Sequence, residues 1–262
     1  LKGKARMAAE LFLPRRIRHG TDDESLASFV RRRLGEEALE RMAQPMVGGI
    51  YTADPETLSL RATLPRFLDM EREHRSLILA MLRQGQAQKS GTSGARYSLF
   101  LSFDRGMQVL VDELAGLKAD VRLNTRVESL KFDRTWSITT NVGEQFEAEC
   151  VCLAVPAYIA ASLLNGSVAA KLNQIKYAST ATINFAYKQS DINHPLNGFG
   201  FVVPFIEKRS LIACTFSSVK FSRRAPSGHA LLRAFAGGAL QPEIFALDES
   251  ELGARVEADL RE

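Results

Sequence analysis

Apolar residues in the first third of the chain recur at the spacing of amphipathic helices. One stripe of the first predicted helix consists of Leu26, Phe29, Val30 and Leu34, and Gly35 closes it. A second stripe runs into Gly48 and Gly49, where backbone freedom permits either a sharp turn or the close approach of another group. Helical spacing continues over residues 60–83. The pattern therefore predicts a helical N-terminal third.

Residues 84–96 interrupt this helical pattern. Their sequence, QGQAQKSGTSGAR, contains no large apolar residue and several Gly and Ser. Such a composition is typical of a mobile surface loop. We expect this loop to separate the helical region from a part of the chain with a different hydrophobic period.

Residues 102–132 have the pattern of a glycine turn, an amphipathic helix and a strand. Apolar residues between 107 and 114 follow helical spacing, whereas Val121, Leu123 and Val127 alternate as in a strand. The segments WSITT and QFEAE predict a hairpin, and the apolar run VCLAVP predicts a parallel strand covered on both faces. This layout is typical of a nucleotide-binding sheet, yet the sequence contains no phosphate-cradling glycine loop.

The last hundred residues combine a helix with four strand-like runs. These runs are TATINFAYK, GFGFVVP, SLIACTFSS and HALLRAFAG, and their spacing predicts an antiparallel sheet. A terminal helix is expected from about Asp248. Taken together, the hydrophobic pattern predicts a fold of the α/β plus α+β class.

The net charge of +4 is concentrated at one end of the chain. Residues 1–33 contain nine Lys or Arg and four Asp or Glu. This segment either contacts anionic lipid or forms a solvated basic face. The arginines lack interleaved aromatic residues, so nucleic acid is not an expected partner. Since Arg31, Arg32 and Arg33 cannot share one helical face, at least one of them is expected to reach a partner.

Cysteine and histidine usage argues against a metal site. The odd number of cysteines, three, argues against a framework of disulfide bonds, and the four histidines are scattered along the chain. We expect no metal, a reducing compartment, and buried positions for Cys150 and Cys152 in their apolar run. No nucleophile lies beside a base in a recognisable hydrolase signature. The sequence alone assigns no catalytic residue.

Three segments together resemble the oxygen-dependent protoporphyrinogen oxidase family, including its coproporphyrinogen-oxidising branch. They are SFVRRRLG, PMVGGIYTADPETLS and EREHRSL. The resemblance continues through RGMQVLVDEL, VCLAVPA, GFGFVVP, ACTFSS and LLRAFAGG, and so covers nearly the whole chain. It corresponds to the middle of the family's polypeptide. The chain is therefore expected to be an internal portion, without the family's glycine-rich dinucleotide loop, C-terminal flavin motif and carboxylate-binding arginine.

The resemblance implies a partial FAD-binding domain of the two-dinucleotide-binding-domain flavoprotein type. It also implies a mixed or antiparallel substrate-binding sheet and a helical subdomain. The expected divisions are a helical, membrane-associating subdomain (1–55), substrate-domain helices with the mobile loop (56–97), the middle of the FAD-binding domain (98–160), and the substrate-binding sheet and helices (161–262).

The resemblance also implies site residues. Val127 occupies the place of a valine whose backbone meets the FAD adenine, and Gly106 and Pro156 complete the implied cofactor-binding set. Arg105 departs from the family's Gly-Gly pair, which puts the local turn in doubt. The implied porphyrinogen-binding residues are Phe199, Gly200, Val202, Thr215 and Phe235; ordinary core positions are the alternative.

The strand period creates a conflict within this set. Phe199 and Phe201 fall on one face of an extended strand, whereas Gly200 and Val202 fall on the other. Both pairs line one cavity only if the strand bends. Gly198 and Gly200 permit such a bend.

The implied activity is FAD-dependent oxidation of protoporphyrinogen IX to protoporphyrin IX in heme biosynthesis, with oxygen as acceptor. Alternatives are oxidation of coproporphyrinogen III to coproporphyrin III, another amine-oxidase-like flavoprotein, and a non-catalytic module that binds membrane or protein partners. The isolated portion is expected to be inactive. The expected location is cytoplasmic, with peripheral contact to the inner face of the cell membrane, and a homodimer is left open.

Overall fold

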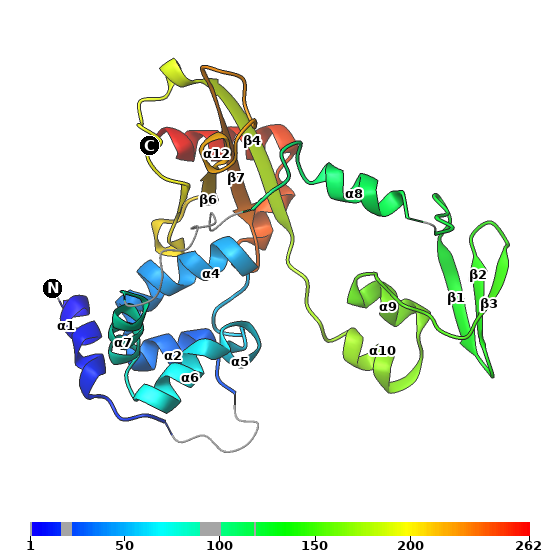
Figure 1. Cartoon of the computed structure of the whole chain (residues 1–262), viewed down its shortest axis with the longest axis horizontal. Helices are drawn as coiled ribbons and strands as arrows, with labels where there is room; N and C mark the ends of the chain where they lie inside the picture. The colour runs from blue at the N-terminus through cyan, green and yellow to red at the C-terminus, as the bar shows by residue number, and fades with distance from the viewer. Residues whose placement is uncertain (1, 17–22, 90–100, 118) are drawn as a thin grey trace. The chain divides into compact units, whose positions relative to one another are not determined.

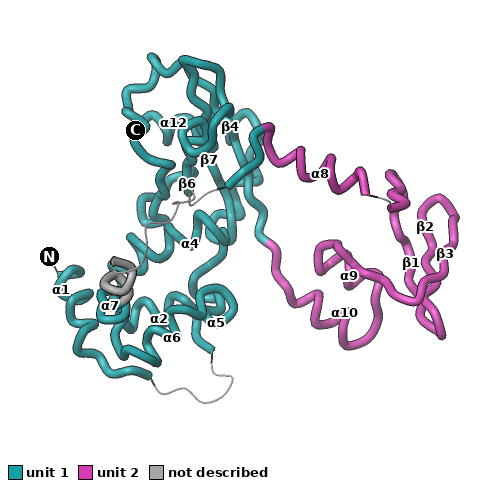
Figure 2. Tube along the Cα trace, in the orientation of Figure 1, with its two compact units in different colours: residues 1–104, 178–262 teal, residues 105–177 magenta. Residues whose placement is uncertain are grey.

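The computed structural model describes residues 2–16, 23–89, 101–117 and 119–262. It divides into two compact units, which are coloured separately in Figure 2. Unit 1 contains Leu1–Asp104 and Ala178–Glu262, and unit 2 contains Arg105–Tyr177. We describe each unit by itself.

The N-terminal part of unit 1 is a helical layer (Figure 1). Its helices are α1 (Lys2–Ala8), η1 (Ala9–Phe12), α2 (Leu26–Arg33), α3 (Glu36–Ala38), the π-helical turn η2 (Leu39–Ala43), α4 (Gln44–Tyr51), α5 (Leu60–Thr63), α6 (Pro65–His74) and α7 (Leu77–Lys89). The hydroxyl of Ser25 accepts a hydrogen bond from the Ser28 amide and so caps α2. The predicted stripe residues Leu26, Phe29 and Val30 are buried in the core of this layer.

Gly48 and Gly49 lie inside α4 and make no turn. The close approach that the sequence allowed does occur at Gly49. A Cβ atom at this position would lie 3.2 Å from Val202 Cγ1 and 3.8 Å from Ala213 Cβ. The missing side chain lets α4 pack closely against the strands that carry these two residues.

The predicted loop over residues 84–96 is wrong for its first part. Helix α7 continues through Lys89, and residues 90–96 lie outside the described part of the chain. The segment from 84 to 89 lacks large apolar residues but is rich in good helix formers such as Gln, Ala and Lys. Helix propensity therefore outweighs the polar composition there.

The C-terminal part of unit 1 is a four-stranded antiparallel sheet, as the spacing predicted. Its strand order is β4 (Thr180–Lys188), β7 (His229–Gly237), β6 (Leu211–Phe216) and β5 (Gly200–Val202). Shorter elements connect or flank the strands: η3 (Gln189–Asp191), η4 (Phe205–Glu207), α11 (Ser217–Lys220) and η5 (Pro242–Ala246).

One face of this sheet packs against the terminal helix α12 (Glu249–Arg261). Asp248 caps this helix, since its carboxylate accepts a hydrogen bond from the Glu251 amide at 2.8 Å. The core between helix and sheet contains Leu211, Cys214, Phe216, Leu232, Ala234, Leu252 and Val256. The opposite face of the sheet, which we call the outer face, carries the alternate residues of each strand.

Unit 2 consists of α8 (Gln108–Ala115), a sheet of β1 (Val127–Phe132), β2 (Trp136–Thr140) and β3 (Gln145–Ala148), and the helices α9 (Ala157–Leu163) and α10 (Gly166–Leu172). The sheet is an antiparallel meander in the order β1-β2-β3. The predicted hairpin is confirmed, because β2 and β3 pair directly.

Two strand predictions in unit 2 are wrong in whole or in part. The strand predicted from the alternation of Val121, Leu123 and Val127 begins only at Val127, where β1 starts. The run VCLAVP forms no strand, and both Cys150 and Cys152 are exposed. A continuous apolar run becomes a buried strand only where other elements cover both of its faces. The described residues of unit 2 supply no strand that pairs with this run.

Candidate functional site

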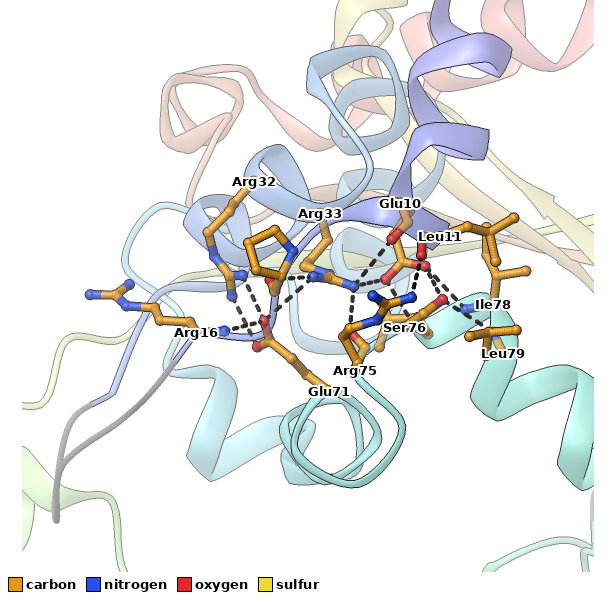
Figure 3. A network of polar contacts seen from close by, with 12 residues as sticks. Glu10, Leu11, Arg16, Arg32, Arg33, Glu71, Arg75, Ser76, Ile78 and Leu79 are labelled. Carbon is orange, nitrogen blue, oxygen red and sulfur yellow. Dashed lines mark hydrogen bonds and ion pairs between the residues drawn. The ribbon is translucent and has the colours of Figure 1, made fainter.

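The segments SFVRRRLG and EREHRSL are joined by a buried polar network (Figure 3). Arg33 lies at its centre, and its side chain is 0% exposed. It forms an ion pair with Glu10 and donates hydrogen bonds to the carbonyl oxygens of Pro14 and Arg75 at 3.0 and 2.6 Å. An unpaired buried guanidinium would be strongly destabilising, so the fold depends on these acceptors.

Glu10 connects Arg33 to the start of α7. Its carboxylate accepts hydrogen bonds from the Ser76 hydroxyl and from the Leu77 amide, the latter at 2.9 Å. It therefore satisfies a free N–H group at a helix N-terminus, where negative charge is favourable. Burial acts to raise the pKa of Glu10, but the hydrogen bonds and the Arg33 charge outweigh burial and hold this pKa below its usual value.

Arg32 and Glu71 form the second half of the network. Their contact is bidentate, with N···O distances of 2.7 and 3.0 Å, and the Glu71 side chain is only 2% exposed. Arg32 also pairs with Glu24 at 2.9 Å. Burial acts to raise the pKa of Glu71, yet its bonds to Arg32 and to the Arg16 amide hold the pKa below its usual value.

The three consecutive arginines are therefore neutralised within the protein. Arg31 is on the surface, where it pairs with Glu36 and Glu56. Arg32 and Arg33 are paired with the carboxylates described above. The expectation that at least one of Arg31–Arg33 reaches a partner is confirmed, because each of them pairs with a carboxylate. These three arginines therefore contribute little to a basic face, and the lipid contact expected of residues 1–33 stays a prediction. The sequence signature marks a structural network.

The outer face of the unit 1 sheet brings together four of the five expected substrate-binding residues. The strand register aligns Gly200, Thr215 and Arg233 in one row, and Val202, Ala213 and Phe235 in the next. Residues in register lie on the same face. Gly200, Val202, Thr215 and Phe235 therefore share the face opposite to the α12 core.

Phe199 precedes β5, so the register does not place its side chain on this face. Its carbonyl oxygen accepts a hydrogen bond from the Phe216 amide at 3.0 Å, and its side chain is 54% exposed. Phe201 is in register with Cys214 and contacts the Phe216 ring, which belongs to the core side. Phe201 and Val202 therefore lie on opposite faces of the sheet, as strand alternation requires, and Phe201 is on the side of the α12 core.

Gly200 has a backbone conformation that suits only glycine. Its φ is +142°, and a Cβ atom there would overlap the carbonyl oxygen of Cys214 and lie 2.9 Å from Thr215 Cα. The pairing of β5 with β6 therefore requires a hydrogen atom at this position.

Helix α4 packs against β5 and β6 at Val202 and Ala213. The Gln44 side chain fixes this contact further, because its carbonyl oxygen accepts a hydrogen bond from the Phe205 amide at 2.9 Å. Apolar side chains at helical spacing are exposed along one side of η2 and α4, namely Met42 in η2 and Met46 and Ile50 in α4. These residues give unit 1 an exposed apolar helix stripe next to strands of the outer face.

The enclosed cavity between α4 and the end of β6 is too small for a tetrapyrrole. It is lined by residues that include Gln44, Gly48, Phe205 and Ile212, and its volume is about 20 Å³. This space holds roughly one water molecule. The exposed outer face is the better candidate for a large flat ligand.

Sequence reasoning missed two polar residues on this face, Arg233 and Asn184. They are in register with each other, and Arg233 Nε donates a hydrogen bond to Asn184 Oδ1 at 3.0 Å. The alternation in HALLRAFAG could have revealed Arg233, because it precedes Phe235 by two residues and so shares its face.

The expected cofactor-binding residues all lie in unit 2. Val127 begins β1, opposite Thr140, and a register shift follows between Val127 and Ser129. Since β1 is an edge strand, its outer backbone groups have no strand partner among the described residues. Pro156 is the residue before α9, and this helix packs against β1.

Gly106 precedes α8 and has a φ of +95°, with open space where a side chain would be. Arg105 is not among the described residues with positive φ. The glycine requirement thus falls on position 106 alone, and the arginine at 105 does not strain the turn. The open space at Gly106 and the free edge of β1 both fit a ligand that approaches the backbone, as the resemblance implies for FAD.

Comparison with known proteins matches the whole chain to one family. The model of the flavin-containing amine oxidoreductases matches residues 1–262. Coproporphyrinogen III oxidase of Bacillus subtilis (strain 168) is 32% identical and covers 100% of this chain and 56% of its own length. Protoporphyrinogen oxidase 1, chloroplastic, of Arabidopsis thaliana is 28% identical, and the alignment covers 91% of this chain and 49% of the relative.

A solved structure agrees with these sequence matches. The crystal structure of a provisionally assigned protoporphyrinogen oxidase from Exiguobacterium sp. 255-15 has a TM-score of 0.81 at 26% identity. The match covers 99% of this chain and 55% of that one. The chain thus spans about half the length of the curated relatives that it matches.

Proposed function

Because this chain belongs to the family of flavin-containing amine oxidoreductases, we propose that it forms the middle part of an FAD-dependent oxidase that converts a porphyrinogen to a porphyrin. The family is flavin-dependent, and its fold contains the mixed helices and antiparallel sheets described above. The relatives named as coproporphyrinogen and protoporphyrinogen oxidases favour a porphyrinogen over an amine as substrate.

The observation that carries this proposal is the strand register of the outer face. Residues that the resemblance assigned to the substrate, and that come from three separate strands, share one face of the sheet. Val202 and Phe235 supply apolar area for a pyrrole ring, and Gly200 allows β5 to pair closely with β6 beside them. This arrangement supports a tetrapyrrole-binding role.

The reaction divides between the cofactor and the protein. Bound FAD supplies a two-electron acceptor that no amino-acid side chain provides. The residues of the outer face orient the porphyrinogen ring, and their apolar side chains exclude water from it. Gly106 and the edge of β1 at Val127 are the residues of this chain that would contact FAD through the backbone.

Peripheral membrane attachment is a further part of this proposal. The three arginines Arg31–Arg33 do not support it, because they pair with carboxylates of the same chain. Among the described helices, none is long and apolar enough to cross a bilayer. The apolar stripe of α4, with Ile50 71% exposed, is the part of unit 1 that we assign to any such contact.

The full-length gene product tests the proposed function. Purified protein is mixed with coproporphyrinogen III or protoporphyrinogen IX in aerated buffer, and porphyrin fluorescence and hydrogen peroxide are followed together. We expect both signals to rise at linked rates. Protein that contains FAD and oxidises neither porphyrinogen would overturn the substrate assignment, and activity toward an amine alone would point to a different oxidase.

A further inference from the structure

Arg233 is surrounded on the outer face by uncharged residues, and the next charged residue of β4 on this face, Lys188, lies four residues beyond the Asn184 that faces Arg233. The outer-face positions around it, read from the strand register, are Thr182, Asn184, Gly200, Val202, Ala213, Thr215, Leu231 and Phe235. Each of these residues is uncharged at neutral pH. A cation whose immediate neighbours are apolar or weakly polar selects for an anionic group on whatever binds there.

The guanidinium of Arg233 is oriented but not neutralised. Its Nε donates to Asn184 Oδ1, and this amide brings no negative charge. Within the described part of the chain, no carboxylate forms an ion pair with Arg233, whereas Arg32 and Arg33 each have one. The remaining N–H donors of the planar guanidinium match the two oxygens of a carboxylate.

We infer that Arg233, held by Asn184, binds a propionate carboxylate of the porphyrinogen and thereby favours coproporphyrinogen III over protoporphyrinogen IX. This inference rests on the proposed function and specifies its substrate. Coproporphyrinogen III carries a propionate on every pyrrole ring and so presents one to Arg233 in every orientation of the macrocycle. Protoporphyrinogen IX carries vinyl groups in place of some propionates, so it presents a propionate to Arg233 in only some orientations. Only a propionate can accept the hydrogen bonds of the guanidinium.

The discrimination also has a repulsive component. When a flat ring covers the outer face, water is removed from Arg233. A vinyl group at this position would leave the charge without a partner in a partly dry site, which is unfavourable. Arg233 therefore both attracts one substrate and disfavours the other.

Asn184 is a positioning residue in this scheme. The substitution Asn184→Asp keeps the size of the side chain but places a carboxylate next to Arg233. The resulting ion pair would compete with the substrate propionate. We therefore expect N184D to weaken coproporphyrinogen binding although Arg233 itself is unchanged.

The experiment compares R233Q, R233K and N184D with the wild type in the full-length protein. R255Q is the matched control, because Arg255 lies on α12 and pairs with Glu251 in the same helix. We expect R233Q and N184D to raise KM for coproporphyrinogen III by about ten-fold, the equivalent of one lost charged hydrogen bond. R233K should retain part of the affinity, and R255Q should resemble the wild type.

The KM for protoporphyrinogen IX should change far less in R233Q, and kcat should stay close to that of the wild type. Equal changes for both substrates, or no change for either, would overturn the inference. Binding of the stable product coproporphyrin III, followed by fluorescence, supplies a second readout. Weaker binding in R233Q and N184D but not in R255Q supports the inference even if the protein oxidises neither porphyrinogen, an outcome that would overturn only the proposed function.

Discussion

Arg33 and Glu10 form an ion pair in which both side chains are fully buried, although the two residues lie 23 positions apart in the chain. The pair ties α2 to η1, and the Glu10 carboxylate continues the contact to the start of α7. Three segments of the helical layer therefore meet at one buried charge pair. A substitution in any of them leaves the remaining charge without its partner.

Glu10→Gln is expected to lower the free energy of unfolding by about 3 kcal/mol, because it removes the direct carboxylate partner of the buried Arg33 and leaves only the longer ion pair with Glu71 at 3.7 Å. Urea unfolding of the full-length variant measures this change. Glu56→Gln is the matched control, since Glu56 is an exposed partner of Arg31 and its loss should change stability by less than about 1 kcal/mol. Similar urea midpoints for Glu10→Gln and Glu56→Gln would contradict the claim that the buried Arg33–Glu10 pair stabilises the fold more than a surface pair does.

Stability should fall with acid through the Glu71 carboxylate. The pKa of Glu71 in the folded protein lies below the ordinary value of 4.5, so the unfolded state takes up the proton first as pH falls. The stabilisation is therefore fully present above about pH 5 and is lost as pH drops through 4.5 and below. In Glu71→Gln, unfolding free energies measured between pH 7 and pH 3 should show a shallower decline. If the unfolding free energy of Glu71→Gln depends on pH as that of the wild type does over this range, the lowered pKa of Glu71 is contradicted.

Gly200→Ala is expected to destabilise the sheet by about 3 kcal/mol, because the new Cβ meets the β6 backbone and φ is positive. Gly253→Ala in α12 is the control. A Cβ at Gly253 meets nothing within 4 Å, so alanine should stabilise the helix by about 0.5 kcal/mol. Thermal unfolding compares the two. A tolerated alanine at position 200 would show that β5 does not need glycine.

The turn before α8 offers a comparison between neighbouring positions. Gly106→Ala should raise the dissociation constant for FAD of the full-length protein, because alanine at a φ of +95° costs about 1 kcal/mol. Arg105→Gly should leave this constant within about two-fold, since Arg105 needs no glycine conformation. Flavin fluorescence titration measures both. A larger change of the dissociation constant in Arg105→Gly than in Gly106→Ala would contradict the assignment of the glycine requirement to position 106.

The sequence predicted unit 1 better than unit 2 for a physical reason. The strands of the unit 1 sheet lie against their own helix α12, so alternation in β7 correctly separates the core residues from Arg233 and Phe235. In unit 2 the run VCLAVP is as apolar as a buried strand, but no described element of the unit pairs with it. Local pattern cannot reveal whether a covering layer is present.

The arginine run shows a second limit of sequence patterns. Charge density suggested a basic surface, yet Glu10, Glu24 and Glu71 lie up to 39 residues from the arginines that they neutralise. Such pairs follow from the three-dimensional packing of helices and leave no local spacing to detect. The motif residues were therefore recognisable by resemblance, but their structural role was not.

Anaerobic flavin reduction tests the central proposal most directly. Full-length protein with bound FAD is mixed with coproporphyrinogen III in the absence of oxygen, and flavin absorbance and porphyrin fluorescence are recorded together. We expect the oxidised flavin band to bleach in the absence of oxygen and to return when oxygen is admitted. Porphyrin should accumulate only after oxygen is admitted, because conversion of a porphyrinogen to a porphyrin takes several two-electron steps and one flavin accepts a single pair of electrons. A flavin band that stays unchanged with both coproporphyrinogen III and protoporphyrinogen IX, or a protein that cannot be loaded with FAD, would contradict the proposal.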